Sequence, residues 1–191
     1  RIAQILTSSG IPNIMSFNGT MFTQDRAVWH NIDLEERLSV CLPTIKELVG
    51  KADYVYETKL DSDDMVHQKF SEVVQSKEFV NRGALYMKKG FAYNVEGRVA
   101  DWNNPTSNQN YTIMFPRRVY FNAKKRLEYL NGFKSHEEVP DKFNAEQLPD
   151  GLYCTVIHGD NISTVWDHPF RGKEFLYEDE KANILKDFLC Q

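Results

Sequence analysis

The sequence is organised around residues 54–74, YVYETKLDSDDMVHQKFSEVV. Residues 54–60 are rich in Tyr, Val and Thr, which favour β-strands, so we expect a buried strand there. Val66, Phe70 and Val74 then recur at helical spacing, which predicts a helix. Between the two segments lie three carboxylates, those of Asp61, Asp63 and Asp64. The stretch therefore predicts an acidic cluster at the junction of a strand and a helix.

Strand-like and helix-like segments alternate along the rest of the chain. The predicted strands are residues 1–10, 83–95, 113–116 and 152–159. The predicted helices are residues 34–49, 117–132 and 178–189. Such alternation is typical of layered α/β proteins, in which ligands bind beyond the carboxyl ends of the strands. We therefore expect one α/β domain, residues 1–191, with a mostly parallel central sheet flanked by helices.

Turn and cap signals mark the ends of several segments. Gly50 is expected to end the helix that precedes it, and residues 135–138, SHEE, have the form of a capping box. Residues 97–112, GRVADWNNPTSNQNYT, are rich in turn-forming Asn, Pro and Ser, so we expect a long surface loop there. Long loops in compact domains are often functional, which makes this loop a candidate part of a binding site.

The overall charge argues against one broad class of function. The chain of 191 residues has a formal net charge of −4 and a pI near 5.8. A protein that binds nucleic acid mainly by neutralising phosphates is usually basic, so we expect no nucleic acid partner. Residues 117–126 do contain a basic cluster, but its helical spacing in an acidic protein favours a solvated helix face.

The sequence also favours a reducing compartment. Its three cysteines, Cys41, Cys154 and Cys190, are widely spaced and form no disulfide framework. Residues 1–10 do not resemble a signal peptide, and no apolar run approaches the length that spans a bilayer. We therefore expect a cytoplasmic protein without a membrane span. Because the chain starts at Arg1 rather than Met, we also expect it to be part of a longer multidomain protein.

Three carboxylates within four residues repel one another unless their charge is compensated. Asp63 or Asp64 is a candidate N-cap of the predicted helix, since Asp accepts hydrogen bonds from the first free N–H groups. A divalent cation would compensate all three, because Mg²⁺ and Mn²⁺ take oxygen ligands, commonly carboxylates plus nucleotide phosphates. An EF-hand is excluded, because Met65 and Val66 stand where that loop needs a ligand and a Gly. His158, at a later strand end, is a candidate further ligand.

Residues 58–66, TKLDSDDMV, resemble the Asp-x-Asp motif that ends a strand in nucleotide-sugar glycosyltransferases of the GT-A type. The Asp-x-Asp-Asp form is similar, more narrowly, to that of bacterial putative rhamnosyltransferases, with Lys59 where that family tends to have Arg. His158 and Gly159 resemble the His and the Gly-containing loop at a C-terminal strand end of retaining GT-A enzymes. The combination also resembles the glycosyltransferase domain of a chlorovirus protein that glycosylates the capsid, which implies the host cytoplasm.

The resemblance implies a GT-A-like fold, a Mn²⁺ or Mg²⁺ ion and a nucleoside diphosphate sugar donor, with UDP as the expected nucleotide. The implied metal ligands are Asp61, Asp63 and His158. The implied donor-binding residues are Thr7, Ser8, Ser9, Arg37, Lys59, Asp61, Asp63 and Gly159. Ordinary turn and surface roles remain the alternative for the first four of these.

The candidates for acceptor binding and chemistry lie elsewhere in the sequence. Trp102, in the predicted surface loop, is placed to stack on a sugar, with the alternative that it pins the loop to the core. The candidate catalytic carboxylates are those of Asp64, Asp101 and Asp160.

The sequence thus predicts a metal-dependent glycosyltransferase that moves a sugar from a nucleoside diphosphate donor to a glycan or glycoprotein acceptor. His158 and Gly159 favour retention over inversion at the transferred sugar. One alternative is a haloacid-dehalogenase-type phosphatase with Asp61 as its nucleophile, since that family also places Asp-x-Asp after a strand. A second alternative is a non-catalytic module that binds a nucleotide-sugar or a carbohydrate.

Overall fold

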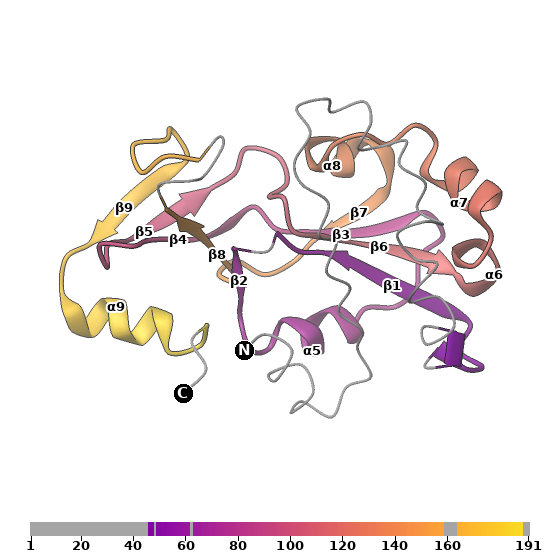
Figure 1. The fold of residues 1–191 in the computed structure, drawn as a ribbon, viewed down its shortest axis with the longest axis horizontal. Helices are drawn as coiled ribbons and strands as arrows, with labels where there is room; N and C mark the ends of the chain where they lie inside the picture. The colour runs from indigo at the N-terminus through magenta and orange to yellow at the C-terminus, as the bar shows by residue number, and fades with distance from the viewer. Residues whose placement is uncertain (1–45, 48, 62, 159–163, 189–191) are drawn as a thin grey trace. The chain divides into compact units, whose positions relative to one another are not determined.

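The computed structural model describes residues 46–47, 49–61, 63–158 and 164–188 (Figure 1). The chain forms two compact units. The first unit comprises residues 1–55 and 116–134, and the second comprises residues 56–115 and 135–191. The expectation of one domain stays a prediction.

The described part of the first unit starts at the end of a helix. Residues 46, 47 and 49 are helical, and the N–H of Gly50 donates a hydrogen bond to the Lys46 carbonyl (3.1 Å). Gly50 has a φ of +50°, the left-handed conformation that often ends a helix, so its predicted role is confirmed. The rest of the predicted helix and the predicted strand at residues 1–10 lie outside the described residues.

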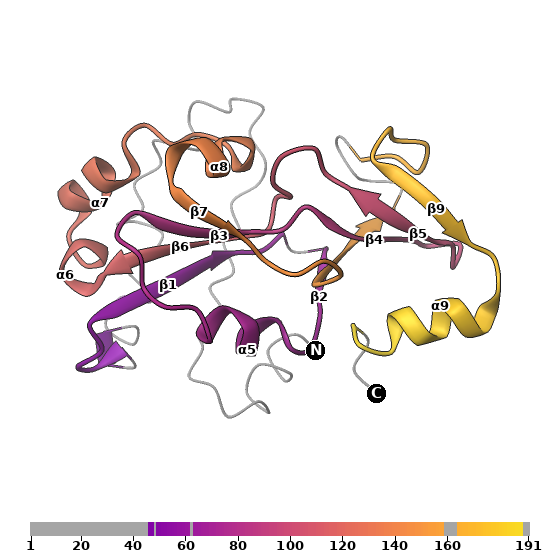
Figure 2. The ribbon, with the colours of Figure 1, turned by 180° about the vertical axis from the view of Figure 1, so that it is seen from behind.

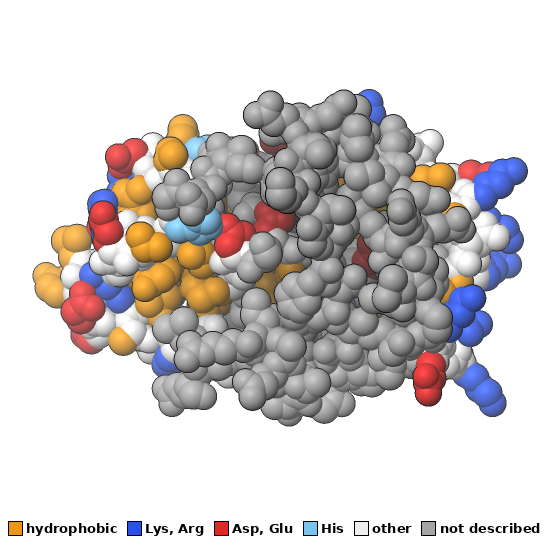
Figure 3. All heavy atoms as spheres, in the orientation of Figure 1, with side chains coloured by type: hydrophobic (Ala, Val, Ile, Leu, Met, Phe, Trp, Pro, Cys, Tyr) orange, Lys and Arg blue, Asp and Glu red, His pale blue; other side chains and the backbone are white. Residues whose placement is uncertain are grey.

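Two helices carry the basic segment of the first unit, α6 (Arg117–Tyr120) and α7 (Ala123–Leu130), where the sequence predicted one. Asn122 separates them, because its side chain accepts a backbone hydrogen bond (3.0 Å) in the first turn of α7. Lys and Arg side chains gather over both helices at the right edge of Figure 3. Arg126 does not belong to this solvated face, since it is buried with its guanidinium 4.6 Å from the Tyr120 ring centroid.

Two mixed sheets make up most of the second unit (Figures 1 and 2). The four-stranded sheet has the order β1 (Tyr54–Lys59), β6 (Tyr111–Pro116), β3 (Gly83–Tyr86), β7 (Asn144–Gln147). The five-stranded sheet has the order β2 (Met65–Val66), β8 (Tyr153–Ile157), β4 (Lys89–Asn94), β5 (Val99–Asn103), β9 (Arg171–Phe175).

Both sheets combine parallel and antiparallel pairing. Parallel pairing joins β3 to β7 and β4 to β8. Antiparallel pairing joins β3 to β6, β2 to β8, β4 to β5 and β5 to β9. The mixed α/β class is therefore confirmed, whereas the prediction of a mostly parallel sheet is wrong.

A short connection explains one of the antiparallel pairs, that of β4 with β5. Residues 83–95, predicted as one strand, form β3 and β4, which are separated by Met87 and Lys88 and belong to different sheets. Residues 99–103 of the predicted surface loop form β5, which returns against β4 through a tight hairpin, so that loop prediction is wrong. Gly97 has a φ of +81° in the hairpin turn, a conformation that L side chains rarely adopt. Two strands joined by so short a turn pair antiparallel.

The segment after the carboxylates begins with a strand rather than a helix. Met65 and Val66 form β2 and lie opposite Cys154 and Tyr153 of β8. Helix α5 (Phe70–Gln75) begins only after a further turn. Apolar residues spaced by four also fit a short strand followed by a helix, so periodicity alone did not locate the boundary. The three carboxylates therefore lie between two strands, β1 and β2.

Further helical segments are described in the second unit: η1 (His136–Glu138), α8 (Val139–Lys142) and α9 (Glu178–Leu185). The Ser135 hydroxyl accepts a hydrogen bond from the Glu137 N–H (3.3 Å), which confirms the Ser135 half of the capping box predicted at residues 135–138. Helix α9 confirms the predicted C-terminal helix. Within the described residues, no helix is long and apolar enough to cross a membrane.

The core of the second unit draws on both sheets. Its buried cluster includes Leu85 of β3, Met114 of β6, Ala92 of β4, Trp102 of β5, and Tyr153 and Ile157 of β8. Strands β4 and β8 approach closely at Gly90, where an added Cβ would lie 2.5 Å from the Tyr153 carbonyl oxygen. Because β8 is packed in this cluster and β2 pairs with β8, the core fixes both the end of β8 and the turn that precedes β2.

Candidate functional site

The acidic turn, defined here as Asp61, Asp63 and Asp64, lies beside the carboxyl end of β8. Strands β2 and β8 are antiparallel, with Met65 opposite Cys154. In an antiparallel pair, the residues that precede one strand run alongside the residues that follow the other. The turn that precedes β2 is therefore directed along the end of β8.

Asp63 and His158 meet at this point. The Nε2 atom of His158 lies 3.0 Å from Oδ2 of Asp63, although the two residues are 95 positions apart in the sequence. Both side chains remain partly open to solvent, with 38% of the Asp63 and 32% of the His158 side chain exposed. The structure thus brings together the ends of the two motifs that the sequence singled out.

Asp61 faces Lys59 at the end of β1. Its Oδ1 atom lies 2.8 Å from the Lys59 ammonium, and the two side chains are 38% and 48% exposed. An ion pair between such exposed groups stabilises a fold by at most about 1 kcal/mol, so the Asp61 carboxylate can exchange this partner at little cost. The Asp61 backbone is held more firmly, because its N–H donates to the buried Asn110 Oδ1 (2.8 Å).

Asp64 is enclosed by protein donors instead. Its Oδ2 atom accepts hydrogen bonds from Gln109 Nε2 (2.6 Å) and Asn110 Nδ2 (2.8 Å), and its Oδ1 atom accepts one from the Val156 N–H (3.2 Å). Burial raises the pKa of Asp64 to about 6, the nearby charge of Asp61 adds to this rise, and the hydrogen bond from Asn110 opposes it.

The predicted N-cap role of Asp63 or Asp64 is wrong. The N-cap position of α5 is Lys69, and no side chain caps that helix. The reason is the additional strand β2, which separates the acidic turn from the helix and pairs with β8.

The donor set of the turn fits a hard divalent cation. Carboxylate oxygens and an imidazole nitrogen are acceptable ligands of Mn²⁺, and Mg²⁺ is commonly bound by one or two carboxylates plus substrate phosphates. Asp63 and His158 already lie in contact, and Asp61 lies two residues before Asp63 with its side chain turned to Lys59. Across the described residues, no three His, Cys, Asp or Glu side chains are grouped as a complete metal site.

Asp101 and Trp102 lie on strand β5 rather than in a loop. Trp102 is 3% exposed and packs against His168 and Phe170, with ring centroids 5.4 and 6.2 Å away. The premise that Trp102 projects from a surface loop towards a sugar is therefore wrong, because alternation along β5 directs it into the core. Burial raises the pKa of Asp101, and the charge of Lys173 opposes this rise.

The remaining candidates lie outside the described residues. They are Thr7, Ser8, Ser9, Arg37, Gly159 and Asp160.

The sequence did not single out the polar residues that hold the acidic turn. Asn108 and Asn110 are fully buried, and Gln109 lies between them. The composition of this segment, rich in Asn, Pro and Ser, is typical of exposed loops, and buried hydrogen-bonding side chains leave no periodic pattern. The one sequence feature that could have indicated their role is that the segment lies directly before a predicted strand.

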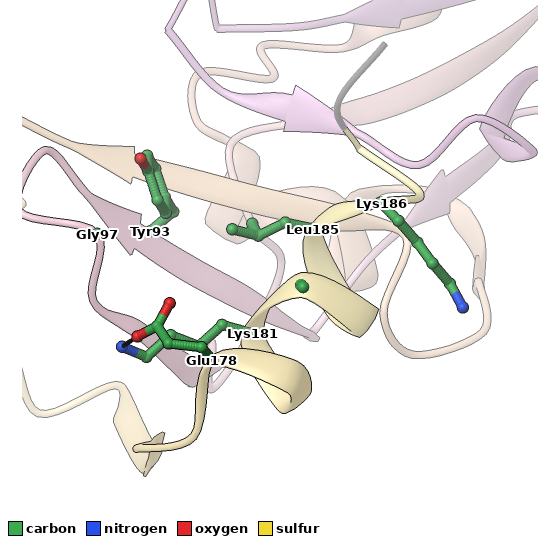
Figure 4. A pocket seen from close by; sticks show the side chains of 7 residues that line it. Tyr93, Gly97, Glu178, Lys181, Leu185 and Lys186 are labelled. Carbon is green, nitrogen blue, oxygen red and sulfur yellow. Dashed lines mark hydrogen bonds and ion pairs between the residues drawn. The ribbon is translucent and has the colours of Figure 1, made fainter. Parts of the chain in front are cut away.

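An open pocket of about 420 Å³ lies between α9 and the β4–β5 hairpin (Figure 4). Its lining includes Tyr93, Gly97, Lys181 and Leu185. Lys181 is paired with Glu178 (2.7 Å) at the pocket. None of the site residues predicted from the sequence lines it, so we do not assign the candidate site to this pocket.

No protein-family profile, curated protein or solved structure matches the chain.

Proposed function

We propose that the chain is a metal-dependent glycosyltransferase that moves a sugar from a nucleoside diphosphate donor, with uridine as the nucleoside, to a glycan or glycoprotein acceptor. The observation that carries the proposal is the 3.0 Å contact between Asp63 and His158. It joins an Asp-x-Asp-Asp turn at the end of one strand to a His at the end of another, which is the arrangement that the resemblance to GT-A enzymes implies.

Asp61, Asp63 and His158 would hold Mn²⁺ or Mg²⁺ in this proposal. When bound, the cation neutralises the donor diphosphate and stabilises the negative charge of the leaving nucleoside diphosphate. Lys59, exposed beside Asp61, adds a positive charge at the same end of β1. The partial exposure of Asp61 and Asp63 leaves both carboxylates accessible to a substrate from solvent.

The charge of the acidic turn supports a cationic ligand. The carboxylates of Asp61 and Asp63 both raise the pKa of Asp64, so each of them disfavours a negative charge on Asp64. Lys59 compensates Asp61 only through an exposed contact. A divalent cation among these groups would relieve the repulsion, which explains why the chain concentrates acid at the end of a strand.

Isothermal calorimetry with Mn²⁺ and UDP tests the proposal. We expect the wild-type protein to bind UDP only with Mn²⁺ or Mg²⁺, and we expect Asp61→Ala and Asp63→Ala to abolish that binding. Asp150→Ala is a matched control, because Asp150 is also a partly exposed carboxylate paired with a Lys, at 3.5 Å from Lys89 Nζ.

Unchanged binding in both Asp variants would contradict the proposal. A beryllium fluoride adduct on Asp61 would indicate a phosphatase instead. If the protein bound UDP-sugars but neither transferred their sugar nor slowly hydrolysed them, the chain would be a non-catalytic binding module.

A further inference from the structure

Asn110 uses both ends of its side-chain amide on the acidic turn. Its Oδ1 atom accepts a hydrogen bond from the Asp61 N–H, and its Nδ2 atom donates one to Asp64 Oδ2, both at 2.8 Å. The residue is fully buried, and its own N–H donates to Asn108 Oδ1 (2.7 Å). One rigid amide group therefore spans the first and last carboxylate residues of the turn.

Asp64 continues this connection to the end of β8. Its Oδ1 atom accepts from the Val156 N–H (3.2 Å), while Oδ2 accepts from both Asn110 and Gln109. Val156 is two residues before His158. The contacts from the Asp61 backbone through Asn110 and Asp64 to Val156 thus link both sides of Asp63 to the strand that leads to His158.

We propose that Asn110 and Asp64 are positioning residues, a polar clamp that sets the backbone of the acidic turn so that Asp63 meets His158. Asp64 is then a part of the support rather than a ligand or a catalytic acid. The effect of the clamp on metal binding rests on the proposed function, whereas its effect on the backbone of the acidic turn does not.

The clamp requires a hydrogen-bond donor and an acceptor at fixed positions. The atom of residue 110 that faces Asp61 must accept a hydrogen bond, and the atom that faces Asp64 must donate one. Asn110→Asp places two carboxylates against each other, and Asp64→Asn sets an amide NH₂ against either Asn110 Nδ2 or the Val156 N–H. Each single exchange therefore breaks the pattern even though the change in volume is small.

The double exchange Asp64→Asn with Asn110→Asp restores the pattern. The new amide at position 64 donates from Nδ2 to the new carboxylate at position 110 and accepts from the Val156 N–H through Oδ1. The other oxygen at position 110 still accepts from the Asp61 N–H. Gln109 keeps its contact by turning its amide so that Oε1 faces position 64.

Amide hydrogen exchange by NMR reads the clamp directly, at the N–H groups of Asp61 and Val156. In each single variant we expect both amides to exchange about tenfold faster or more, and in the double variant to return towards the wild-type rate. The Mn²⁺ affinity measured with UDP should fall and recover in the same order.

Asn104→Asp is the matched control. Asn104 is a buried Asn of the same segment, but its Nδ2 donates to Tyr153 Oη (3.2 Å) and not to the acidic turn. A general cost of burying a new carboxylate would lower the stability of this variant too. The exchange rates of the Asp61 and Val156 amides should remain those of the wild type.

The outcomes separate the two proposals. Single variants that keep both amides protected, or a double variant that fails to restore them, overturn the clamp. If a single variant does not fold, folding of the double variant counts as rescue, and a double variant that stays unfolded while Asn104→Asp folds overturns the pairing. If the amides behave as expected but the wild-type protein binds no Mn²⁺, the clamp stands and the proposed function fails.

Discussion

The acidic turn and strand β5 of the second unit each contain residues that the sequence marked as site candidates, yet the structure holds them in different ways. Asp61 and Asp63 sit between two strands with more than a third of each side chain exposed. Asp101 and Trp102 sit within a paired strand, and Trp102 is buried in the core. The carboxylates of Asp61 and Asp63 are therefore partly open to solvent, whereas the Trp102 side chain belongs to the core.

The largest expected effect is a loss of stability when the Trp102 side chain of β5 is removed. Trp102→Ala should lower the free energy of unfolding by about 3–5 kcal/mol, because it empties a large, almost fully buried side chain from the core cluster. Denaturant unfolding measures this. Val95→Ala, at a 69% exposed position of the same hairpin, should change stability by about 0.5 kcal/mol or less. A loss below about 1 kcal/mol in the Trp102 variant would show that the residue is not a core residue.

The second prediction concerns the pKa of Asp64 in the acidic turn. Burial raises the pKa of Asp64 from its ordinary value of 3.8 to about 6. Between these values the folded protein holds more protons at Asp64 than the unfolded chain, so this group lowers stability progressively as the pH rises from about 4 to about 6. Carbon-13 NMR of the Asp64 carboxyl carbon in metal-free protein should give a midpoint near pH 6. A midpoint near pH 4 would contradict the enclosure of Asp64.

The smallest expected effect concerns the ion pair at the end of β1. Lys59→Ala should change the free energy of unfolding by less than about 1 kcal/mol, because Lys59 and Asp61 are both exposed. It should nevertheless weaken UDP binding in the presence of Mn²⁺, since it removes a positive charge beside the proposed donor site. Lys89→Ala, which removes the similar partner of Asp150, should leave UDP binding unchanged. Equal UDP affinity in the two variants would exclude Lys59 from the donor site.

The sequence predicted the parts of this site that lie at the ends of regular strands. Tyr54–Lys59 and Tyr153–Ile157 are runs of β-formers, and their ends located the acidic turn and His158. Strand β2 was missed, because two residues are too few to produce an alternating pattern. The buried segment around Asn110 was missed because its composition is that of a loop, while its burial depends on hydrogen bonds to distant residues.

The sequence pattern did not predict which strands pair antiparallel. Alternating strands and helices suggested parallel crossovers, but the connection from β4 to β5 is a tight hairpin around Gly97. The hairpin can be predicted only if Val99–Asn103 is assigned as a strand. Its polar residues, Asp101 and Asn103, alternate with buried Ala100 and Trp102, a pattern present in the sequence but obscured by the turn-forming residues that follow.

Asp63 and His158 are proposed to form part of one cation site. Electron paramagnetic resonance of Mn²⁺ in the presence of UDP measures this most directly, because free and bound Mn²⁺ give distinct signals. We expect the wild-type protein to bind Mn²⁺, Asp63→Ala and His158→Ala each to weaken binding by about tenfold or more, and the double variant to lose little beyond either single change. Equal Mn²⁺ binding by the wild-type protein and both single variants, or no binding by the wild-type protein, would contradict the claim.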